Sequence, residues 1–222
     1  MLADVGLVGL PSVGKSTIIS SISRSKPKIA AYHFTTLVPN LGVTKTQDNY
    51  SFVVADLPGL IEGASQGEGL GDKFLRHIER TKVIAHVIDM GSVEGRNPYD
   101  DYVLINKELE AFNAKLLKKP MIIVANKMDI PGAKENLEEF KKKVTDKKIF
   151  EVSGATKEGL QDVVNYLGKI LKELPEEELY DEDRIESHVL YKFKRDDKYT
   201  ITKEDDVWVI HGTKIEKLFK MT

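Results

Sequence analysis

The residues Gly9-Leu10-Pro11-Ser12-Val13-Gly14-Lys15-Ser16 fit the pattern G-x-x-x-x-G-K-[ST], whose chemistry is phosphate binding. Glycine at the two fixed positions lets the backbone wrap closely around a phosphate, with successive amide N–H groups pointing inward. We expect the Lys15 ammonium to reach the β- and γ-phosphates of a nucleotide. The hydroxyl of Ser16 is placed to bind Mg²⁺, a cation that prefers oxygen ligands.

A second pattern, D-x-x-G, is formed by Asp56-Leu57-Pro58-Gly59. Its carboxylate is expected near the Mg²⁺, and the N–H of Gly59 is expected to contact the γ-phosphate. The next residue is the apolar Leu60, where Ras-like enzymes have a glutamine that orients the attacking water. The sequence therefore predicts no water-positioning amide at this place and favours a scaffold role, in which Mg²⁺, Lys15 and backbone amides carry catalysis. The polar alternatives for the missing amide are Glu62, Gln66 and Glu68.

Two further loops are predicted to recognise guanine. In Asn126-Lys127-Met128-Asp129, the aspartate can accept hydrogen bonds from N1 and N2 of guanine, whereas adenine offers an acceptor at N1 and no N2 amine. A buried acceptor that faces another acceptor stays unpaired, so such a site rejects the wrong base. In Ser153-Gly154-Ala155, backbone N–H groups are expected to meet the guanine O6.

The segment Ala30 to Asn40, AAYHFTTLVPN, contains the adjacent threonines Thr35 and Thr36. A threonine oxygen on Mg²⁺ would order this segment only when the γ-phosphate is present, which gives a switch with two shapes. Chemistry alone does not choose between the two threonines.

Short apolar runs without alternation precede the loops and predict parallel strands that are covered on both faces. These runs are Val5–Val8, Phe52–Ala55, Val83–Ile88, Met121–Ala125 and the residues around Ile149–Val152. Helical patterns alternate with them, the clearest from Leu160 to Leu174. The fold class is therefore α/β, a P-loop domain with a mostly parallel sheet and helices on both faces. Because four motifs follow predicted strands in order, we expect a guanine-nucleotide-binding domain.

A domain boundary is expected near Pro175, where the last helical pattern stops. We expect a nucleotide-binding domain over residues 1–175, an acidic linker over 176–187, and a partial α+β domain over 188–222. In the last piece, His188–Phe193 and Tyr199–Ile210 are predicted to contain strands.

Composition agrees with a cytoplasmic protein that does not enter a membrane. The 222 residues include no cysteine and carry a formal charge of -2, so neither a disulfide framework nor a whole-molecule positive field is expected. No apolar run approaches the roughly eighteen residues of a membrane span. Lys141–Lys143 neighbour several glutamates and are interpreted as a solvated face. His86 is interpreted as a satisfied core histidine, His77 as a helix-surface residue, and His33 as an exposed loop residue.

The stretches GLPSVGKST, KPKIAAYHFTTLVPNLG, ADLPGLIEGASQGEGLGDKFLRHIERT and VIDM closely resemble the Obg (also CgtA) family of GTPases, over Ala3 to about Leu174. The resemblance implies that Phe34, Thr35, Thr36, Leu37 and Val38 contact the nucleotide and that Thr36 is the switch ligand to Mg²⁺. It also implies that Asp56, Leu57, Pro58 and Gly59 sense the γ-phosphate. The candidate catalytic set is then Lys15, Thr36 and Gly59.

The family resemblance implies a slow, Mg²⁺-dependent GTPase switch of large-ribosomal-subunit assembly, with links to growth control and to ppGpp. The alternative is a binding module that senses GTP, GDP or ppGpp and in which hydrolysis is incidental. The glycine-rich amino-terminal domain of the family is expected to be absent and the chain to be monomeric, so ribosome binding by this piece is in doubt. Two residues depart from the pattern: Ser12 replaces the asparagine of potassium-activated relatives, and Gly154 replaces the usual alanine.

Overall fold

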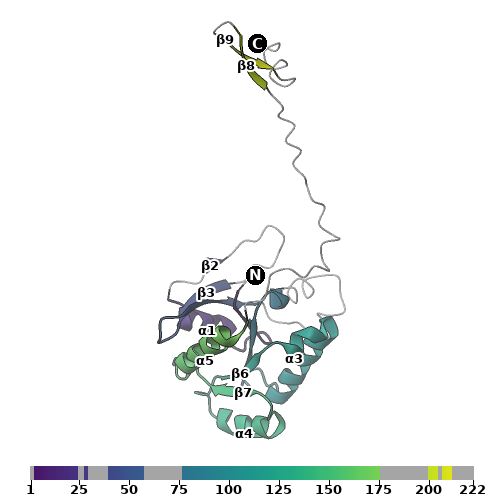
Figure 1. The fold of residues 1–222 in the computed structure, drawn as a ribbon. Helices are drawn as coiled ribbons and strands as arrows, with labels where there is room; N and C mark the ends of the chain where they lie inside the picture. Colours follow the sequence, from purple (N-terminus) through teal and green to yellow (C-terminus); the bar gives the residue numbers. More distant parts are fainter. Residues whose placement is uncertain are drawn as a thin grey trace. The chain divides into compact units, whose positions relative to one another are not determined.

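The computed structural model describes residues 3–24, 28–29, 40–57, 77–175, 200–204 and 207–211. Backbone contacts divide the chain into two compact units, Met1–Pro175 and Glu176–Thr222. Figure 1 shows the first unit as a sheet with helices packed against it.

The sheet of the first unit has seven strands in the order β2-β3-β4-β1-β5-β6-β7. Five of them are parallel, namely β1 (Val5–Val8), β4 (Ser51–Asp56), β5 (Val83–Asp89), β6 (Met121–Asn126) and β7 (Lys148–Glu151). The strand β3 (Asn40–Lys45) pairs antiparallel with β4, and β2 (Lys28–Ile29) pairs antiparallel with β3. The mostly parallel sheet confirms the predicted fold class.

Register places β1 at the centre of this arrangement. Val5 lies between Val54 of β4 and Val83 of β5, and all three side chains are fully buried. Every residue of β1, β5 and β6 is buried, which explains why these strands appear in the sequence as continuous apolar runs.

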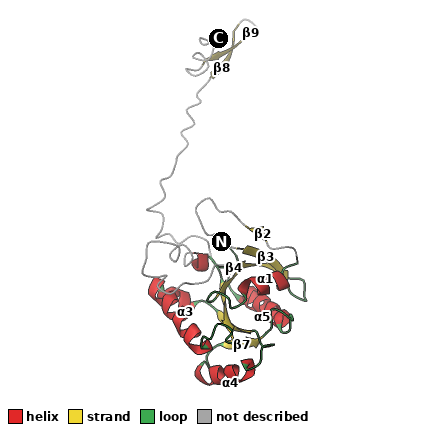
Figure 2. Ribbon diagram, turned by 180° about the vertical axis from the view of Figure 1, so that it is seen from behind, coloured by secondary structure: helices red, strands yellow, loops and turns green. Residues whose placement is uncertain are grey.

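Helices cover both faces of the sheet (Figures 1 and 2). On one face, α1 (Lys15–Ile22) lies beside α5 (Leu160–Glu173), and on the other, α3 (Pro98–Phe112) lies beside α4 (Ala133–Lys143). A 3₁₀ helix, η1 (Ala114–Lys118), follows α3. Asn97 caps α3 by accepting from the backbone N–H of Tyr99, and Pro98 occupies its first turn, where a missing N–H costs nothing.

The strand β3 was not predicted, and its packing shows why its sequence is unusual. A Cβ atom on Gly42 would lie 2.0 Å from Oγ of Ser23 and 2.8 Å from Cγ1 of Ile19. Glycine at this point lets α1 approach the sheet closely, and it breaks the apolar pattern by which a strand is recognised.

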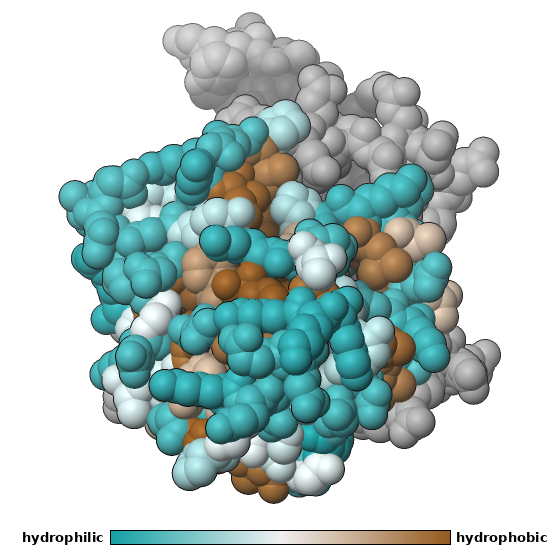
Figure 3. All heavy atoms as spheres, turned by 90° about the horizontal axis from the view of Figure 1, so that it is seen from below, coloured by the Kyte–Doolittle hydropathy of each residue, from teal (hydrophilic) through white to brown (hydrophobic). Residues whose placement is uncertain are grey.

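Charged side chains dominate the outer surface of α4, at the lower end of the domain in Figure 1. Lys141 donates to Glu151 at 2.8 Å and lies 3.8 Å from Glu138, which agrees with the predicted solvated face. Seen from below, the surface is largely hydrophilic, with smaller hydrophobic areas between the polar ones (Figure 3). None of the described helices is long and apolar enough to cross a membrane.

The second unit contains an antiparallel pair, β8 (Thr200–Glu204) and β9 (Val207–His211), which overlaps the predicted segment Tyr199–Ile210 and ends one residue beyond it. The strand predicted at His188–Phe193 lies outside the described residues.

Candidate functional site

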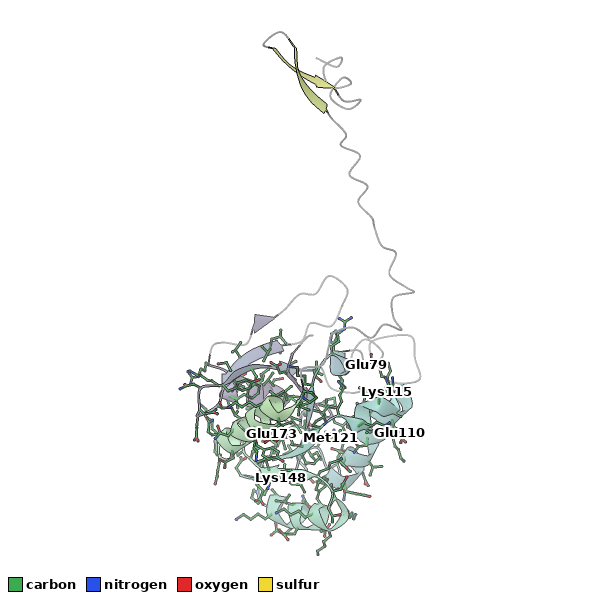
Figure 4. All side chains as sticks on the ribbon, in the orientation of Figure 1. Glu79, Glu110, Lys115, Met121, Lys148 and Glu173 are labelled. Atoms are coloured by element: carbon green, nitrogen blue, oxygen red, sulfur yellow. The ribbon has the colours of Figure 1, made fainter. Side chains whose placement is uncertain are left out.

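The site lies at the carboxyl ends of the parallel strands, where the predicted loops meet. The opposite edge is marked in Figure 4 by Met121 and Lys148, the first residues of β6 and β7. Because parallel strands bring their carboxyl ends to one edge, the loops after β1, β6 and β7 lie close to one another and to the end of β4. The contacts below describe how they meet.

The loop after β1 has the close packing that its glycines allow. A Cβ atom on Gly9 would lie 2.4 Å from the backbone oxygen of Val87 in β5, so no side chain fits there. Gly14 has a φ of 97° and forms the N-cap of α1, a left-handed conformation that favours glycine. Ser12 also has a positive φ, of 65°, which makes this a tightly wound loop at the start of a helix.

Lys15 lies inside this loop and is buried, with 7% of its surface exposed. Its Nζ donates to the backbone oxygens of Gly9 and Leu10, each at 2.9 Å. Burial lowers the pKa of the Lys15 ammonium from 10.5 to about 8, and the charge of the Asp56 carboxylate opposes this shift in part. Among the described residues, two carbonyls accept from this ammonium and one carboxylate lies near it, so it can interact with an anionic phosphate.

Ser16 and Asp56 form the point where a metal ion would fit. The Oγ of Ser16 donates to Oδ2 of Asp56 at 2.6 Å, and Oδ1 of Asp56 is buried without a hydrogen-bond partner among the described residues. A buried carboxylate oxygen in this condition needs a ligand. Hydroxyl and carboxylate oxygens suit Mg²⁺, which usually takes few protein ligands and fills its shell with phosphate and water oxygens. In the described part of the chain no group of three or more His, Cys, Asp or Glu could hold a metal ion.

Asn126 connects three loops. Its Nδ2 donates to the backbone oxygen of Val13 at 2.8 Å, and its Oδ1 accepts from the backbone N–H of Gly154 at 2.9 Å. The residue is buried, with 2% exposed. Its role is therefore structural: it holds the phosphate loop, the end of β6 and the loop after β7 at fixed positions relative to one another.

The two residues that follow have different surroundings. Lys127 has a φ of 64°, and its Nζ donates to Oδ2 of Asp89 at 2.8 Å. Asp89 ends β5, is buried, and also accepts from the backbone N–H of Gly91 at 2.9 Å. Asp129 is exposed, so its carboxylate is accessible to a ligand. The lysine is thus fixed in place while the aspartate is presented to solvent.

The backbone amides of the loop after β7 are not equivalent. The N–H of Ser153 donates to the backbone oxygen of Glu158, and that of Gly154 donates to Asn126. Within the described part of the chain, Ala155 is exposed and its N–H has no acceptor. Of the three predicted donors to guanine O6, Ala155 is therefore the one whose N–H is available.

Several predicted site residues lie outside the described residues. They are Phe34, Thr35, Thr36, Leu37, Val38, Pro58 and Gly59. The same holds for Leu60, for the polar alternatives Glu62, Gln66 and Glu68, and for His33.

Two contacts at the site were not foreseen from the sequence. Asp89 was noted only within the VIDM resemblance, yet it fixes Lys127. Arg96 donates through Nη2 to the backbone oxygen of Pro11 at 3.0 Å and through Nε to Asp101 at 3.3 Å. A loop arginine before a helix carries no signal of this long-range contact.

Two histidines of the first unit, His77 and His86, differ in full or in part from their predicted surroundings. His77 was expected on a helix surface, which is wrong: it is 3% exposed, and its Nδ1 has no partner among the described residues. His86 is in the core as predicted and stacks on Tyr102, with ring centroids 5.6 Å apart. It is not fully satisfied, because its Nδ1 has no hydrogen-bond partner within the described ranges.

Three features define a P-loop nucleotide-binding domain: the strand order of the sheet, the loop before α1 with glycines at its two fixed positions, and the buried lysine that follows it. Residues 4–127 match the family model of 50S ribosome-binding GTPases. The chain belongs to this family.

The resemblance to Obg is confirmed by whole-chain similarity. The chain is 57% identical to GTPase Obg of Streptococcus pneumoniae (strain ATCC 700669 / Spain 23F-1) over 232 residues, which cover 100% of this chain and 54% of the relative. It is 58% identical to GTPase Obg of Halalkalibacterium halodurans over 225 residues, which cover 100% of this chain and 53% of the relative. The chain therefore spans about half the length of the curated relatives that it matches.

Solved structures agree with the fold. A single-residue variant of Era from Aquifex aeolicus, bound to GDP and aluminium fluoride, is 27% identical with a TM-score of 0.57, covering 82% of this chain and 60% of that one. The G domain of the T. maritima FeoB iron transporter is 23% identical with a TM-score of 0.57, covering 74% of this chain and 96% of that one. The latter supports the fold alone.

Proposed function

We propose that this chain is a guanine-nucleotide switch that hydrolyses GTP slowly to GDP and phosphate and requires Mg²⁺. The observation that carries the proposal is the pair of hydrogen bonds from Asn126, which join the phosphate loop to the loop after β7. A domain that fixes its phosphate-binding and base-recognition loops together is built for one kind of nucleotide. The similarity to relatives named GTPase Obg supports the same activity.

The roles of the described residues follow from their positions. The backbone N–H groups of Gly9 to Ser16, apart from Pro11, would surround the β-phosphate, and Lys15 would interact with the β- and γ-phosphates. Ser16 and Asp56 would hold Mg²⁺, which supplies charge neutralisation for the transferred phosphoryl group. Asp129 would accept from N1 and N2 of guanine, and the N–H of Ala155 would donate to O6. These fixed dipoles and charges stabilise the transition state without having to reorganise.

The switch contacts belong to the same proposal. Thr36 would order its segment through Mg²⁺, and Gly59 would contact the γ-phosphate. Because Leu60 offers no hydrogen bond to water, the unassisted rate is expected to be on the order of 10⁻³ per second or less. Substitution Leu60→Ala is then expected to leave this rate within several-fold.

The test measures hydrolysis of GTP and ATP by the purified chain with Mg²⁺. GTP should be used and ATP should not, and Asp129→Asn should weaken guanine binding and favour xanthine, because the carboxamide can donate to its C2 oxygen. The matched control is Asp162→Asn, an exposed carboxylate on α5. Equal use of GTP and ATP would overturn the base assignment.

The wider proposals follow the relatives. We propose a division into a G domain (1–175), an acidic linker (176–187) and a partial carboxy-terminal domain (188–222), in a monomeric cytoplasmic protein without a membrane contact. GDP, GTP and ppGpp are the proposed ligands, and the large ribosomal subunit is the proposed partner of the full-length protein. Comparing partner binding with GDP, GTP, a non-hydrolysable analogue and ppGpp separates a hydrolytic cycle from a pure binding module. A full response to the analogue would show that switching does not need hydrolysis.

A further inference from the structure

A second concave site lies between the end of α1, β3 and the start of α5. It is a cavity of about 330 Å³ whose polar lining includes Ser21, Ser23, Arg24, Thr44, Lys45 and Lys157. Ligand pockets in proteins begin at about this volume. The cavity is therefore large enough for a small anion with room for part of an attached group.

The charged residues among the described lining of this cavity are all cations. Arg24 comes from the end of α1, Lys45 from β3 and Lys157 from the turn before α5, so three separate elements each bring one cation to it. None of the described residues that line it is acidic. None of the three cations forms an ion pair with a described carboxylate, whereas several other lysines of the domain do. Uncompensated positive charges that converge on a concavity attract an anion.

The hydroxyl groups of the lining add no free donor. Ser21 donates to the backbone oxygen of Gly154 at 3.1 Å and Thr44 to that of Ile22 at 3.0 Å, so both protons are used. The Oγ of Ser23 is buried against β3, where a Cβ atom on Gly42 would lie 2.0 Å from it. The three cations are therefore the groups that this cavity offers to an anion.

We propose that this cavity, the α1–β3–α5 pocket, is a second anion site that binds a phosphate group through Arg24, Lys45 and Lys157. The phosphate is carried either by a small free ligand or by an RNA backbone, and both sources offer the same tetrahedral, multiply charged oxygens. None of the three cations is assigned a contact with the nucleotide in the GTP proposal, although Lys157 lies in the same loop as Ala155.

Lys157 allows a clean test. It has a φ of 70°, a conformation that asparagine tolerates better than most residues. Substitution Lys157→Asn therefore removes the charge without adding backbone strain, and Lys157→Arg keeps the charge. The double variant Lys45→Gln/Lys157→Asn leaves Arg24 as one of the three cations. The Kd of this variant for a phosphate probe should therefore rise at least about tenfold. The matched control is Lys134→Gln, an exposed lysine on α4.

The experiment follows backbone amide signals of the ¹⁵N-labelled 222-residue chain during titration with pyrophosphate and, separately, with a six-nucleotide single-stranded RNA. The chain is saturated with GDP and Mg²⁺ first, and ionic strength is held constant with chloride. Saturable shifts at Arg24, Lys45 and Lys157 are expected, which the double variant weakens and Lys134→Gln does not. A response to pyrophosphate identifies a small phosphate ligand, and a response to RNA alone identifies a nucleic-acid backbone.

Two results would overturn the proposal: no saturable shift at these amides with either probe, or equal weakening by the Lys134→Gln control. If the amide spectrum shows that the double variant does not fold, the single variant Lys157→Asn is used in its place. Its Kd for the phosphate probe is expected to rise about fivefold. Because the signals are residue-specific, shifts at Gly14 and Ser16 would report the nucleotide loops separately. Anion binding at the α1–β3–α5 pocket can therefore be measured even if the chain does not bind GTP.

Discussion

A Cβ atom added to Gly14 would lie 2.3 Å from Nδ2 of Asn126, so the phosphate loop and the end of β6 pack with no room for a side chain between them. The same nitrogen donates to Val13, the residue before the glycine. The shape of the phosphate loop therefore depends on a residue of the base-recognition loop. In this domain, the phosphate loop and the base-recognition loop are held together by direct packing and a hydrogen bond.

Substitution Asn126→Ala is expected to lower the free energy of unfolding by about 2–4 kcal/mol, because it leaves the buried Val13 carbonyl and Gly154 N–H unpaired. Urea denaturation of the nucleotide-free chain measures the change. The control is Asn106→Ala, which removes one bond to Tyr102 from a half-buried helix position and should cost less than about 1 kcal/mol. Indistinguishable unfolding of Asn126→Ala and the unmodified chain would show that Asn126 does not hold the loops together.

Two glycine substitutions should behave in opposite ways. At Gly154, a Cβ atom would lie 3.3 Å from Ile18 and 3.5 Å from Oδ1 of Asn126, a contact that small shifts can relieve. Gly154→Ala should therefore unfold within about 1 kcal/mol of the unmodified chain and keep its affinity for GTP. Gly14→Ala, with a φ of 97° and the Asn126 contact, should lose nucleotide binding. Fluorescent GTP-analogue binding and urea midpoints of both variants test this, and tolerance of Gly14→Ala would contradict it.

The parallel strands and the loops that follow them were predictable because both signals are contiguous in the sequence. A run such as Val83–Ile88 is apolar except for His86, because both of its faces are covered. The glycines of the phosphate loop fix a backbone shape within eight residues, so spacing alone identified it.

Contacts between distant segments were not predictable in the same way. Asn126 was expected only as part of a base-recognition motif, whereas its bonds to Val13 and Gly154 depend on three-dimensional packing. The burial of His77 likewise depends on neighbours that its local charged sequence, RHIER, does not reveal. Tertiary packing decides these cases, and a pattern in one segment does not report it.

The buried Lys15 should reduce the stability of the nucleotide-free chain. Its folded pKa, about 8, is below its unfolded value of 10.5, so between these values the unfolded chain binds the extra proton and stability rises with pH. The cost is fully present below pH 8. Substitution Lys15→Met should therefore raise the free energy of unfolding at pH 7 by about 1–2 kcal/mol, and this gain should shrink toward pH 10.

The Lys15→Met variant should also lose affinity for GTP, so stability and function change in opposite directions. Urea denaturation of nucleotide-free protein at pH 7 and pH 10 gives the stability, and the exposed Lys134→Met on α4 serves as the control. A variant that is less stable than the unmodified chain at pH 7 would show that the hydrogen bonds to Gly9 and Leu10 outweigh the cost of burial.

His86 should make the chain sensitive to mild acid. Burial, and secondarily the charge of Lys15, lower the pKa of its imidazole from 6.5 to about 3. As the pH falls below 6.5, the unfolded histidine binds a proton that the folded one does not, so stability falls toward pH 3.

Substitution His86→Phe keeps a ring against Tyr102 and removes the titration. The difference in unfolding free energy between variant and unmodified chain should be constant from pH 8 to 7 and shift by about 1 kcal/mol in favour of the variant at pH 5.5. Urea midpoints at these pH values measure it, with Asn106→Ala as the non-titrating control, and a difference that stays flat through pH 5.5 would mean that the folded chain accommodates a charged His86.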